Sequence, residues 1–287
     1  MDLVVFGLLR GAIFALSAFG FSLVLGVLGI VNLAHGIFVV LGAAVTYALV
    51  TELQLPIVAA CALAALSAGL LGAVLQRALI ARVFALHPFM VLVQTFGIAV
   101  VLTEALNHAF GTSERVLRVD LGDLPPALDL GTFVPTLDLI VFAIALVSAA
   151  LLFLLLQKSE FGRAVRACRD SRRNAELVGI DANRIYMLTM AVCGVWAGLA
   201  GSLLVMLTPT AAYMHFHWTV DAFLVVVIGG MGSMVGALVG GFIYGILNFS
   251  AYYIYPTLAP AIIFGALILV LIVRPQGLFS LGTLARK

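Results

Sequence analysis

The chain has 287 residues, of which 64% are hydrophobic and only 10% are charged, and its mean hydropathy is +1.22. Soluble globular domains are about 45–50% apolar and about 25% charged, so the composition excludes an ordinary soluble domain. The formal net charge of +2 gives no basis for expecting a nucleic-acid partner.

Apolar runs of membrane-spanning length recur along the chain, and each is a candidate transmembrane helix. Lipid cannot satisfy free backbone groups, so spanning segments must be helices or closed barrels. Barrel strands alternate in polarity, whereas residues 139–156 are apolar on every face. The sequence therefore predicts an all-α polytopic membrane protein with about eight or nine spans, forming one domain over residues 1–287 in contact with the lipid bilayer.

The predicted spans follow one another with short connections. In chain order they are residues 3–31, 37–51, 57–75, 89–110, 139–156, 187–207, 220–250 and 261–273. The N-terminus has no basic region ahead of its apolar run, so we expect no cleaved signal peptide and a retained first span.

A polar interruption at residues 31–36 separates the first two apolar segments, and the second segment is short for a complete span. Transport proteins place polar backbone near the membrane midplane at interrupted helices of this kind. Asn32, His35 and Gly36 are therefore candidates for lining a translocation pathway. Capping of the helix break is the alternative role for Asn32 and His35.

Lysines and arginines are concentrated in three connections. The basic loop, residues 157–186, has one lysine and six arginines; the link at 76–88 has two arginines, and the C-terminal tail has two arginines and a lysine. Cytoplasmic loops of membrane proteins carry an excess of these residues. We therefore expect all three connections, including the C-terminus, on the cytoplasmic side, and the acidic loop at 111–138 on the periplasmic side.

The run at residues 220–250 conflicts with this orientation if it crosses the membrane only once. Four glycines lie within residues 229–236, and each weakens a helix by about 1 kcal/mol. We predict that the run breaks there into two segments that turn near the cytoplasmic side; re-entry of residues 261–273 is the alternative. The candidate pathway residues at this break are Gly229, Gly230, Gly232 and Ser233.

The basic loop has the pattern of a folded unit. Its arginines recur every three to four residues between positions 163 and 173, which places them on one face of a surface helix. Asp170 or Ser171 can cap a second short helix that stops at Gly179, and Asp181 can cap the following span. A basic anchor on anionic lipid is the alternative, but the acidic residues among the arginines favour a protein partner.

We expect structural roles for the other polar residues in or beside the spans. We expect Gln94 and Thr95 to make packing hydrogen bonds and Asp221 to cap the N-terminus of its span. The histidines and the tryptophan of residues 215–218 are placed in an outer link, as part of an interfacial aromatic belt.

The sequence lacks the motifs of several kinds of chemistry. The three cysteines form no CxxC pair, so neither a disulfide framework nor a metal site is expected. No GxxxxGK[ST] motif is present, so the chain cannot hold ATP by that route. Few charges lie within the spans to relay an ion. We expect a protein without cofactors or catalytic residues, whose energy enters from outside the membrane through the basic loop.

Three stretches resemble one family of permeases: residues 32–47 (NLAHGIFVVLGAAVTY), the basic loop with the span after it (SEFGRAVRACRDSRRNAELVGIDANRIY and onward), and residues 223–247 (FLVVVIGGMGSMVGALVGGFIYGIL). They are similar to permease subunits of high-affinity branched-chain amino acid importers of the ATP-binding-cassette (ABC) class, specifically the H-type of the two permeases. The resemblance extends in order over essentially the whole chain.

The resemblance implies a multi-pass permease of the bacterial inner membrane that forms half of a translocation pathway. Its partners would be a second homologous permease, two cytoplasmic ABC ATPase subunits that hydrolyse the ATP, and a periplasmic substrate-binding protein. The family's loop carries a coupling helix that docks on the ATPase. The residues expected to take part in this coupling are Gly162, Arg163, Arg166, Ala175, Glu176 and Gly179.

The substrate expected from the resemblance is a branched-chain amino acid, with urea, short amides and aromatic acids as alternatives within the same class of permease. Two other classes of protein remain open. An ion-coupled secondary carrier would need a buried acid or histidine with a partner in mid-span. An intramembrane serine protease would need a histidine beside Ser233, but His215 and His217 are expected on the opposite side of the membrane.

Overall fold

The structure is a computed structural model that describes residues 2–84, 88–122, 124–125, 127–129 and 132–279. Its helices in chain order are α1 (Asp2–Leu28), α2 (His35–Thr51), α3 (Ile57–Leu75), the π-helical turn η1 (Gln76–Ile80), α4 (Ala81–Val83), α5 (Pro88–Phe110), α6 (Thr136–Lys158), α7 (Glu160–Asp170), α8 (Arg172–Leu177), α9 (Ala182–Leu204), the 3₁₀ turn η2 (Ala212–Met214), α10 (His215–Gly229), α11 (Met234–Ile254), the 3₁₀ turn η3 (Pro256–Leu258) and α12 (Ala259–Val273).

The described chain is a polytopic bundle of helices, as predicted. Eight helical segments in these ranges are long and apolar enough to cross a membrane, and α2 is a shorter apolar helix. The short strands β1 (Ala127–Asp129) and β2 (Phe133–Pro135) pair antiparallel within the loop between α5 and α6. This hairpin was not predicted, because three-residue strands carry too little alternation to be recognised.

Helix α1 is the centre of the bundle. It packs against α6, α9, α10 and α11, and 17 of its 27 residues are buried. Glycines allow its close approach to α11, since the Cα of Gly11 lies where a side chain on Gly245 would have to go. Small residues permit this contact where lipid gives no hydrophobic drive for helix association. The spacing of glycines four residues apart in the sequence thus serves packing here.

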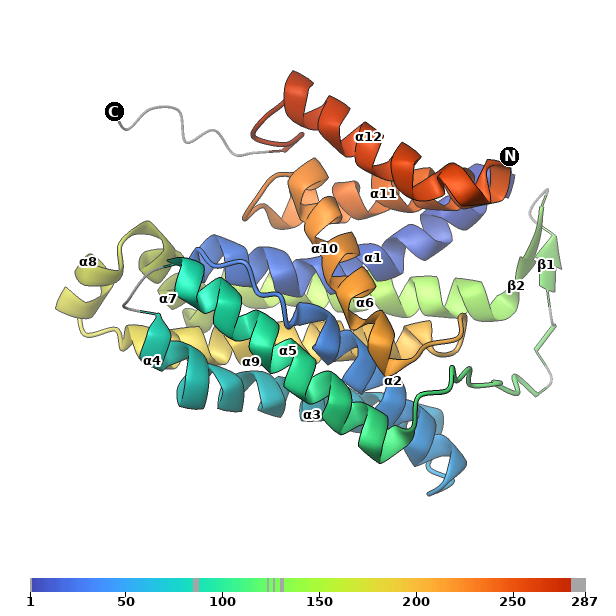
Figure 1. Ribbon diagram of the computed structural model, residues 1–287, viewed down its shortest axis with the longest axis horizontal. Helices are drawn as coiled ribbons and strands as arrows, with labels where there is room; N and C mark the ends of the chain where they lie inside the picture. Colours follow the sequence, from blue (N-terminus) through green and yellow to red (C-terminus); the bar gives the residue numbers. More distant parts are fainter. Residues whose placement is uncertain (1, 85–87, 123, 126, 130–131, 280–287) are drawn as a thin grey trace.

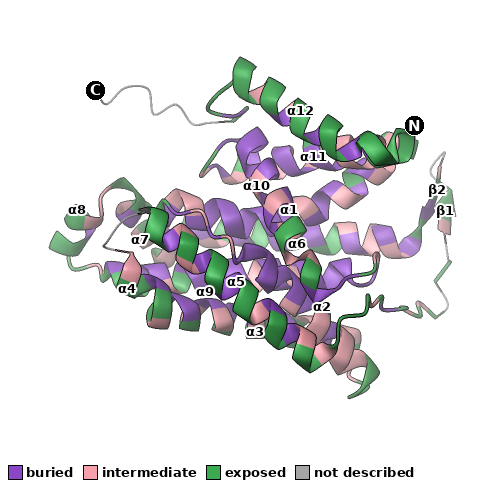
Figure 2. Cartoon of the chain, in the orientation of Figure 1, coloured by how far each residue is buried: buried purple, intermediate pink, exposed green. Residues whose placement is uncertain are grey.

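The helices around this centre present apolar side chains outward. Figure 2 shows a buried interior and extensive exposed surface on α3, α5 and α12. Exposed fractions reach 68% at Leu70, 68% at Val101 and 77% at Ile272. Such surfaces suit contact with lipid or with another membrane subunit, where exposure of apolar side chains carries no penalty.

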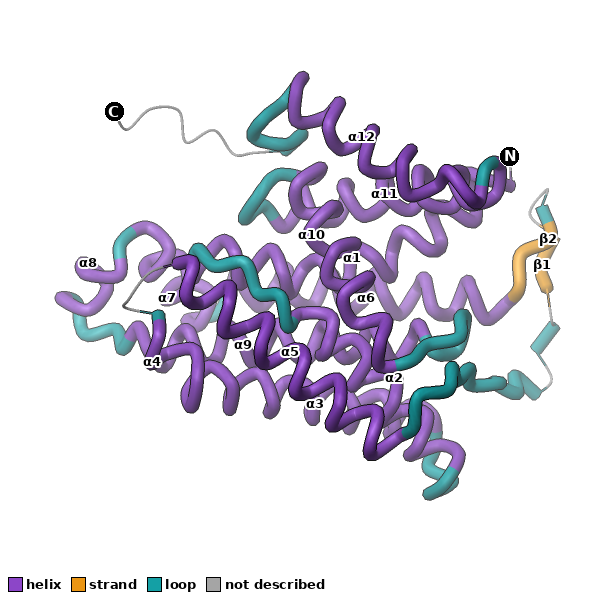
Figure 3. The backbone as a smooth tube through the Cα atoms, viewed as in Figure 1, coloured by secondary structure: helices purple, strands orange, loops and turns teal. Residues whose placement is uncertain are grey.

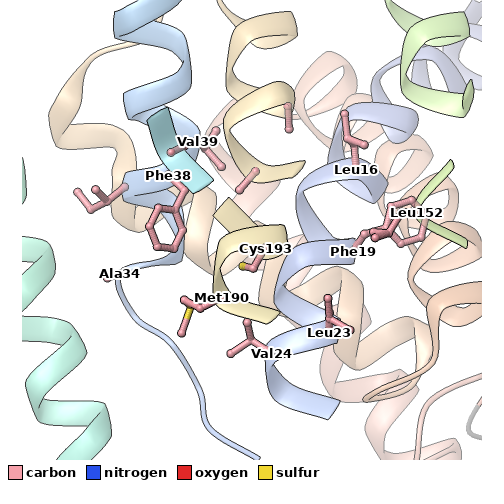
Figure 4. Packing of buried hydrophobic residues seen from close by; sticks show 14 of the residues in the cluster. Leu16, Phe19, Leu23, Val24, Ala34, Phe38, Val39, Leu152, Met190 and Cys193 are labelled. Carbon is pink, nitrogen blue, oxygen red and sulfur yellow. The ribbon is translucent and has the colours of Figure 1, made fainter. Parts of the chain in front are cut away.

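The core joins helices that are distant in sequence. Figure 4 shows side chains of α1, α2, α6 and α9 converging, with Leu16 and Phe19 of α1 facing Leu152 of α6, and Met190 of α9 below Phe38 of α2.

Both predicted interruptions are present. Residues 29–34 form an extended connection between α1 and α2, and residues 230–233 form a tight turn between α10 and α11 (Figure 3). α10 with η2, α11, and α12 with η3 are each long and apolar enough to cross a membrane, which fits three passes over residues 212–273. In Figure 1, α12 runs toward the end of the bundle where α7 and α8 lie.

Three predicted boundaries differ from the structure by five residues or more. The third span does not end at Leu75, because the helix continues through η1 and α4 to Val83. α9 begins at Ala182 rather than at residue 187, directly after its Asp181 cap. α10 begins at His215 rather than at residue 220. In each case we predicted a loop where polar residues adjoin an apolar run, although the end of a helix can also contain polar residues.

Candidate functional site

The first interruption is closed by its own polar side chains. Gly29 ends α1 with φ +68°, and the chain then runs back along the bundle in extended form. The Asn32 side-chain oxygen accepts a hydrogen bond from the Ala34 amide at 3.0 Å. The Asn32 side-chain nitrogen lies 3.7 Å from the sulfur of Met190 on α9. Asn32 is 2% exposed, and these contacts match the capping role that the sequence left open.

His35, the first residue of α2, is completely enclosed, with 0% exposure. Its Nε2 lies 3.1 Å from the carbonyl oxygen of Ser17 on α1, and its Nδ1 lies 3.5 Å from the Sγ of Cys193 on α9. His35 therefore joins three helices at the centre of the bundle.

Two threonines from other helices complete this interruption. Thr95 of α5 accepts a hydrogen bond from the Leu33 amide at 3.2 Å, in keeping with the packing role predicted for it. Thr219 of α10 accepts one from the Gly36 amide at 2.8 Å. Gly36 has no room for a side chain, because a Cβ would overlap the carbonyl oxygen of His215. Thr219 was not identified from the sequence, since nothing local distinguishes it from other threonines in helices.

The second interruption is built from glycines. Gly230 and Gly232 have φ +109° and +76°, values that favour residues without a Cβ. Gly229 packs directly against the backbone of Gly236, which closes the hairpin of α10 on α11. Ser233 accepts a hydrogen bond from the Gly236 amide at 3.0 Å and so caps α11.

The position of Ser233 also tests the serine-protease alternative. His215 begins α10 and the turn follows its last residue, Gly229. At 1.5 Å per residue, about 21 Å of helix axis separates His215 from the turn that holds Ser233, and about 18 Å separates His217 from it. Neither histidine of α10 can act as a base for Ser233.

A segment beyond α12 also contacts the second interruption. The amides of Leu278 and Phe279 donate to the carbonyl oxygens of Ile228 and Gly229, both at 2.9 Å. Carbonyl groups at the C-terminal end of a helix need such external donors. The sequence showed no sign of this contact, which depends on where the chain returns after α12.

The basic loop is folded as two helices, each begun by a side-chain cap. Ser159 accepts from the Gly162 amide, and Ser171 accepts from the Asn174 amide. Of the two predicted candidates for the second cap, Ser171 rather than Asp170 fills the position. Gly179 ends the unit with φ +87°, and Asp181 accepts from the Arg184 amide at the start of α9.

One face of α7 is buried and the other carries charge. Val165 and Cys168 are buried, whereas Arg163, Arg166 and Arg169 are exposed. Burial raises the pKa of the Cys168 thiol, with the negative charge of Glu176 acting in the same direction. Cys168 is therefore a neutral packing residue at physiological pH.

The tip of α8 combines a buried anchor with exposed apolar residues. Ala175 is 2% exposed, and its carbonyl oxygen accepts a hydrogen bond from the Ile180 amide at 3.0 Å. Glu176 is exposed and forms an ion pair with Arg172 at 2.9 Å. Leu177 and Val178 are 79% and 76% exposed. No prediction from the sequence concerned these two residues.

The basic loop and the second interruption meet at what we call the loop–turn junction. Arg169 of α7 donates to the carbonyl oxygen of Gly232 at 3.4 Å, and a Cβ on Gly26 of α1 would lie 3.0 Å from the Gly232 Cα. A cavity of about 200 Å³ lies between the basic loop, α1 and the glycine turn. Its lining includes Ser22, Gly26, Gly162, Arg166, Arg169 and Ser233.

The predicted site residues thus fall into two groups. Gly162, Arg166 and the glycine turn come together at the loop–turn junction, and Arg166 also donates to the Leu156 carbonyl oxygen. Asn32, His35 and Gly36 instead make their described contacts with α1, α9 and α10. Within the described ranges, no three histidine, cysteine or acidic side chains gather to hold a metal ion.

One assignment is corrected by the structure. Asp221 does not cap its helix, because α10 begins six residues earlier, at His215. Asp221 is instead 3% exposed and accepts a hydrogen bond from the Tyr244 hydroxyl of α11 at 2.5 Å. His215, in turn, lies within α10 and faces Thr103 of α5 at 3.0 Å.

Comparison with known proteins gives one consistent result. The sequence model of the family described as "Branched-chain amino acid transport system / permease component" matches residues 3–273. The high-affinity branched-chain amino acid transport system permease protein LivH of Escherichia coli (strain K12) is 27% identical over 288 residues, covering 96% of this chain and 93% of its own.

Two further relatives extend the comparison. The permease protein BraD of Pseudomonas aeruginosa, from a system of the same description, is 27% identical over 290 residues, covering 96% of this chain and 94% of its own. The probable branched-chain amino acid transport permease protein LivM of Methanocaldococcus jannaschii is 31% identical over 115 residues, covering 38% of this chain and 33% of its own. No solved structure matches the chain.

Proposed function

The chain belongs to the family of branched-chain amino acid transport permease components, and from this we propose that it forms half of the translocation pathway of an ABC importer. A transport role fits the bundle of apolar helices and the family. An ion-coupled carrier and the other substrate classes are not favoured, because LivH and BraD, which match over nearly the full length, are named for branched-chain amino acids.

The partners we propose are a second homologous permease, two cytoplasmic ATPase subunits and a periplasmic substrate-binding protein. Support for a second permease comes from the match to two differently named permeases, LivH and LivM. Support for separate ATPase subunits comes from the sequence, which has no nucleotide-binding motif. The binding protein would deliver a branched-chain amino acid to the periplasmic face.

The proposed orientation places α7 and α8 in the cytoplasm of a bacterium and the β1–β2 hairpin in the periplasm. These elements lie at opposite ends of the bundle (Figure 1). Six arginines and a lysine lie in the basic loop, and such an excess marks the cytoplasmic side. The C-terminus would then be cytoplasmic, because α12 runs toward the end that holds α8.

The loop–turn junction is the observation that supports a coupling role most directly. We propose that the ATPase contacts the exposed tip of α8, where Glu176, Leu177 and Val178 face outward. Movement of the tip would pass through α7 to the turn at residues 230–233, since Arg169 holds the Gly232 carbonyl. The turn connects α10 to α11, and both pack on the central helix α1. ATP-driven motion of the loop would thereby reach the membrane-spanning core.

The coupling residues predicted from the resemblance have distinct places in this proposal. Ala175 anchors α8 on the bundle, and Gly179 provides the left-handed backbone that ends it. Gly162 lets α7 pack against the backbone at Leu156, which leaves Arg163 exposed for contact. For the residues of the two interruptions, we propose a place along the pathway that the assembled pair of permeases forms.

The experiment uses the complete importer in proteoliposomes, with ATP inside and leucine-loaded binding protein outside. Gly179→Pro should reduce leucine uptake and substrate-stimulated ATP hydrolysis at least about tenfold, since proline cannot adopt φ +87° and has no amide to donate. Glu176→Arg should have a similar effect, because it reverses the charge at the exposed tip.

Gly122→Pro is the matched control, since Gly122 also has a positive φ of +60° but lies in the opposite connection. It should leave uptake near that of the unaltered importer. Normal uptake with Gly179→Pro and Glu176→Arg would refute the coupling role, and absence of leucine uptake by the unaltered importer would refute the proposed substrate.

A further inference from the structure

The cavity at the loop–turn junction is lined by two arginines of α7 that have no acidic partner. Arg166 and Arg169 both line it, and none of the described residues around it is an aspartate or a glutamate. Two other arginines of the basic loop each form an ion pair with a glutamate, at 3.3 and 2.9 Å. Within the described ranges, Arg166 and Arg169 form none. The cavity therefore carries positive charge that the described part of the chain does not neutralise.

Each of these two guanidinium groups has donors to spare. A guanidinium has five N–H donors. Nη1 of Arg166 donates to the Leu156 carbonyl oxygen, and Nη1 of Arg169 donates to the Gly232 carbonyl oxygen. The positive end of the α11 dipole lies here as well, because Met234, the first residue of that helix, also lines the cavity. These groups suit an anion, and the planar fork of arginine matches a phosphate in particular.

An apolar groove of about 300 Å³ continues from this cavity along the spans. The cavity and the groove share Phe153, Met234 and Val235. The described residues that line the groove are all apolar and come from α1, α6 and α11. On α6 they extend from Phe153 back to Leu146, which is about 10 Å of helix axis at 1.5 Å per residue. Since α6 ends at Lys158, the groove leads from the end of the bundle toward its middle.

The joined cavity and groove have the polarity of a single amphiphile. In a bilayer, headgroups lie at the ends of the spans and acyl chains lie along them. A soluble phosphate would use the arginines but leave the groove empty. An apolar helix of another subunit would fill the groove but leave the two arginines without a counter-charge. An anionic phospholipid satisfies both parts.

We propose that an anionic phospholipid binds at the loop–turn junction, with its phosphate on Arg166 and Arg169 and one acyl chain in the groove between α1, α6 and α11. Its headgroup would contact both α7 and the glycine turn, where Arg169 already joins the two. The site is separate from the exposed tip of α8, for which the ATPase contact is proposed. Lipid binding does not require transport, so this inference stands apart from the proposed function.

The first test measures binding to the purified full-length protein in detergent by native mass spectrometry. Three probes are added: palmitoyl-oleoyl phosphatidylglycerol, phosphatidylethanolamine with the same chains, and glycerol 3-phosphate, which has no chains. Phosphatidylglycerol should bind at least about tenfold more tightly than phosphatidylethanolamine, whose ammonium group offsets the phosphate charge. Glycerol 3-phosphate should not displace it at equal concentration. Equal affinity for the two lipids would overturn the inference, and so would displacement by glycerol 3-phosphate, which would indicate a site for soluble anions.

The second test removes the charge from the cavity. Arg166→Gln combined with Arg169→Gln should weaken phosphatidylglycerol binding at least about tenfold, through loss of charge-assisted hydrogen bonds. The matched control is Arg163→Gln combined with Arg173→Gln, which removes the same charge from exposed positions of the basic loop outside the cavity. The control should bind the lipid normally. An equal loss in both double variants would show a general attraction of the loop for anionic lipid and would overturn a specific site.

The third test fills the groove. Ala150→Trp, at an exposed position of α6 in the groove, should weaken phosphatidylglycerol binding at least about fivefold. Val147→Trp is the control, because Val147 is exposed on the same helix outside the groove. If the arginine variant does not fold, Ala150→Trp and the three probes decide instead. Normal lipid binding by Ala150→Trp would overturn the inference; if that variant also lost its association with a second permease, the groove would be a subunit interface.

Discussion

The two interruptions of the apolar runs solve the same problem in different ways. At residues 29–36, backbone groups inside the bundle are satisfied by the Asn32 side chain and by side chains from elsewhere in the fold, such as Thr95 and Thr219. At residues 230–233, they are satisfied by a glycine turn, by the Ser233 cap and by a segment that follows α12. The first interruption depends on fixed tertiary contacts, and the second depends mainly on local conformation.

Exposure separates the two interruptions further. His35 is 0% exposed, whereas Met231 in the glycine turn is 59% exposed. The turn also contacts α7 through Arg169. The comparison indicates that the first interruption is a fixed anchor and the second a point at which the basic loop can act on the spans. The following variants are chosen to break this distinction or to sharpen it.

The largest effect is expected at the anchor. In Gly36→Ala the new methyl group would overlap the His215 carbonyl oxygen, so α2 and α10 must separate. We expect a loss of at least about 3 kcal/mol in stability, at or above the upper end for overpacked cores, and little folded protein in detergent by size-exclusion chromatography. Gly97→Ala is the control, because nothing lies within 4 Å of a Cβ at that position. Equal yields of the two proteins would show that the anchor is not rigid.

A smaller effect on stability is expected at the turn. Gly232→Ala forces an alanine to φ +76°, which costs about 1–2 kcal/mol, and its Cβ would lie 3.3 Å from the Gly26 Cα. We expect assembly with the partner subunits to persist while ATP-driven leucine uptake falls several-fold. Yield and uptake falling together, as for Gly36→Ala, would remove the distinction between the two interruptions.

The connection between loop and turn should contribute less again. Arg169→Gln removes the charge-assisted hydrogen bond to the Gly232 carbonyl. Because this contact is long and exposed, we expect uptake to fall only about 2- to 5-fold, which corresponds to about 0.5–1 kcal/mol. Arg173→Gln, at an exposed position on α8, serves as the control for charge alone. A similar fall in both variants would mean that the loop's net charge, rather than the contact with the turn, governs uptake.

The last test concerns the packing of α7 rather than uptake. Burial raises the pKa of the Cys168 thiol above the ordinary value of a cysteine. The thiol therefore stays protonated up to and beyond that ordinary pKa. The stabilisation from burying it is lost only as the pH rises through the raised pKa. At pH 8, N-ethylmaleimide should therefore label Cys168 at least about tenfold more slowly than a cysteine introduced at exposed position 173. Mass spectrometry measures both rates, and equal rates would show that α7 leaves the bundle readily.

Local patterns accounted for much of the fold. Span positions follow from apolar length, and both interruptions follow from polar or glycine residues within those runs. The cap at Asp181, the stop at Gly179 and a cap at either Asp170 or Ser171 were predicted because capping involves residues only three or four positions apart. Such interactions are set by neighbours in sequence, so they can be read without knowing the fold.

The errors arose where contacts between residues distant in sequence determine the structure. Asp221 looked like a helix cap, but its partner is Tyr244, 23 residues later. Gln76 looked like the start of a loop, yet it is buried within a continuing helix. The sequence did not single out Leu177 and Val178, yet α8 projects from the bundle and exposes both.

The sequence alone determined that this chain is a helical membrane protein of one permease family, with two interrupted runs and a folded basic loop. Tertiary structure alone decided that Thr219 supports the first interruption, that Arg169 reaches the second, and that Asp221 binds the Tyr244 hydroxyl. The reason is that apolar length, glycine content and caps act within a few residues. A hydrogen bond or a cavity between helices depends instead on how whole helices are placed against one another.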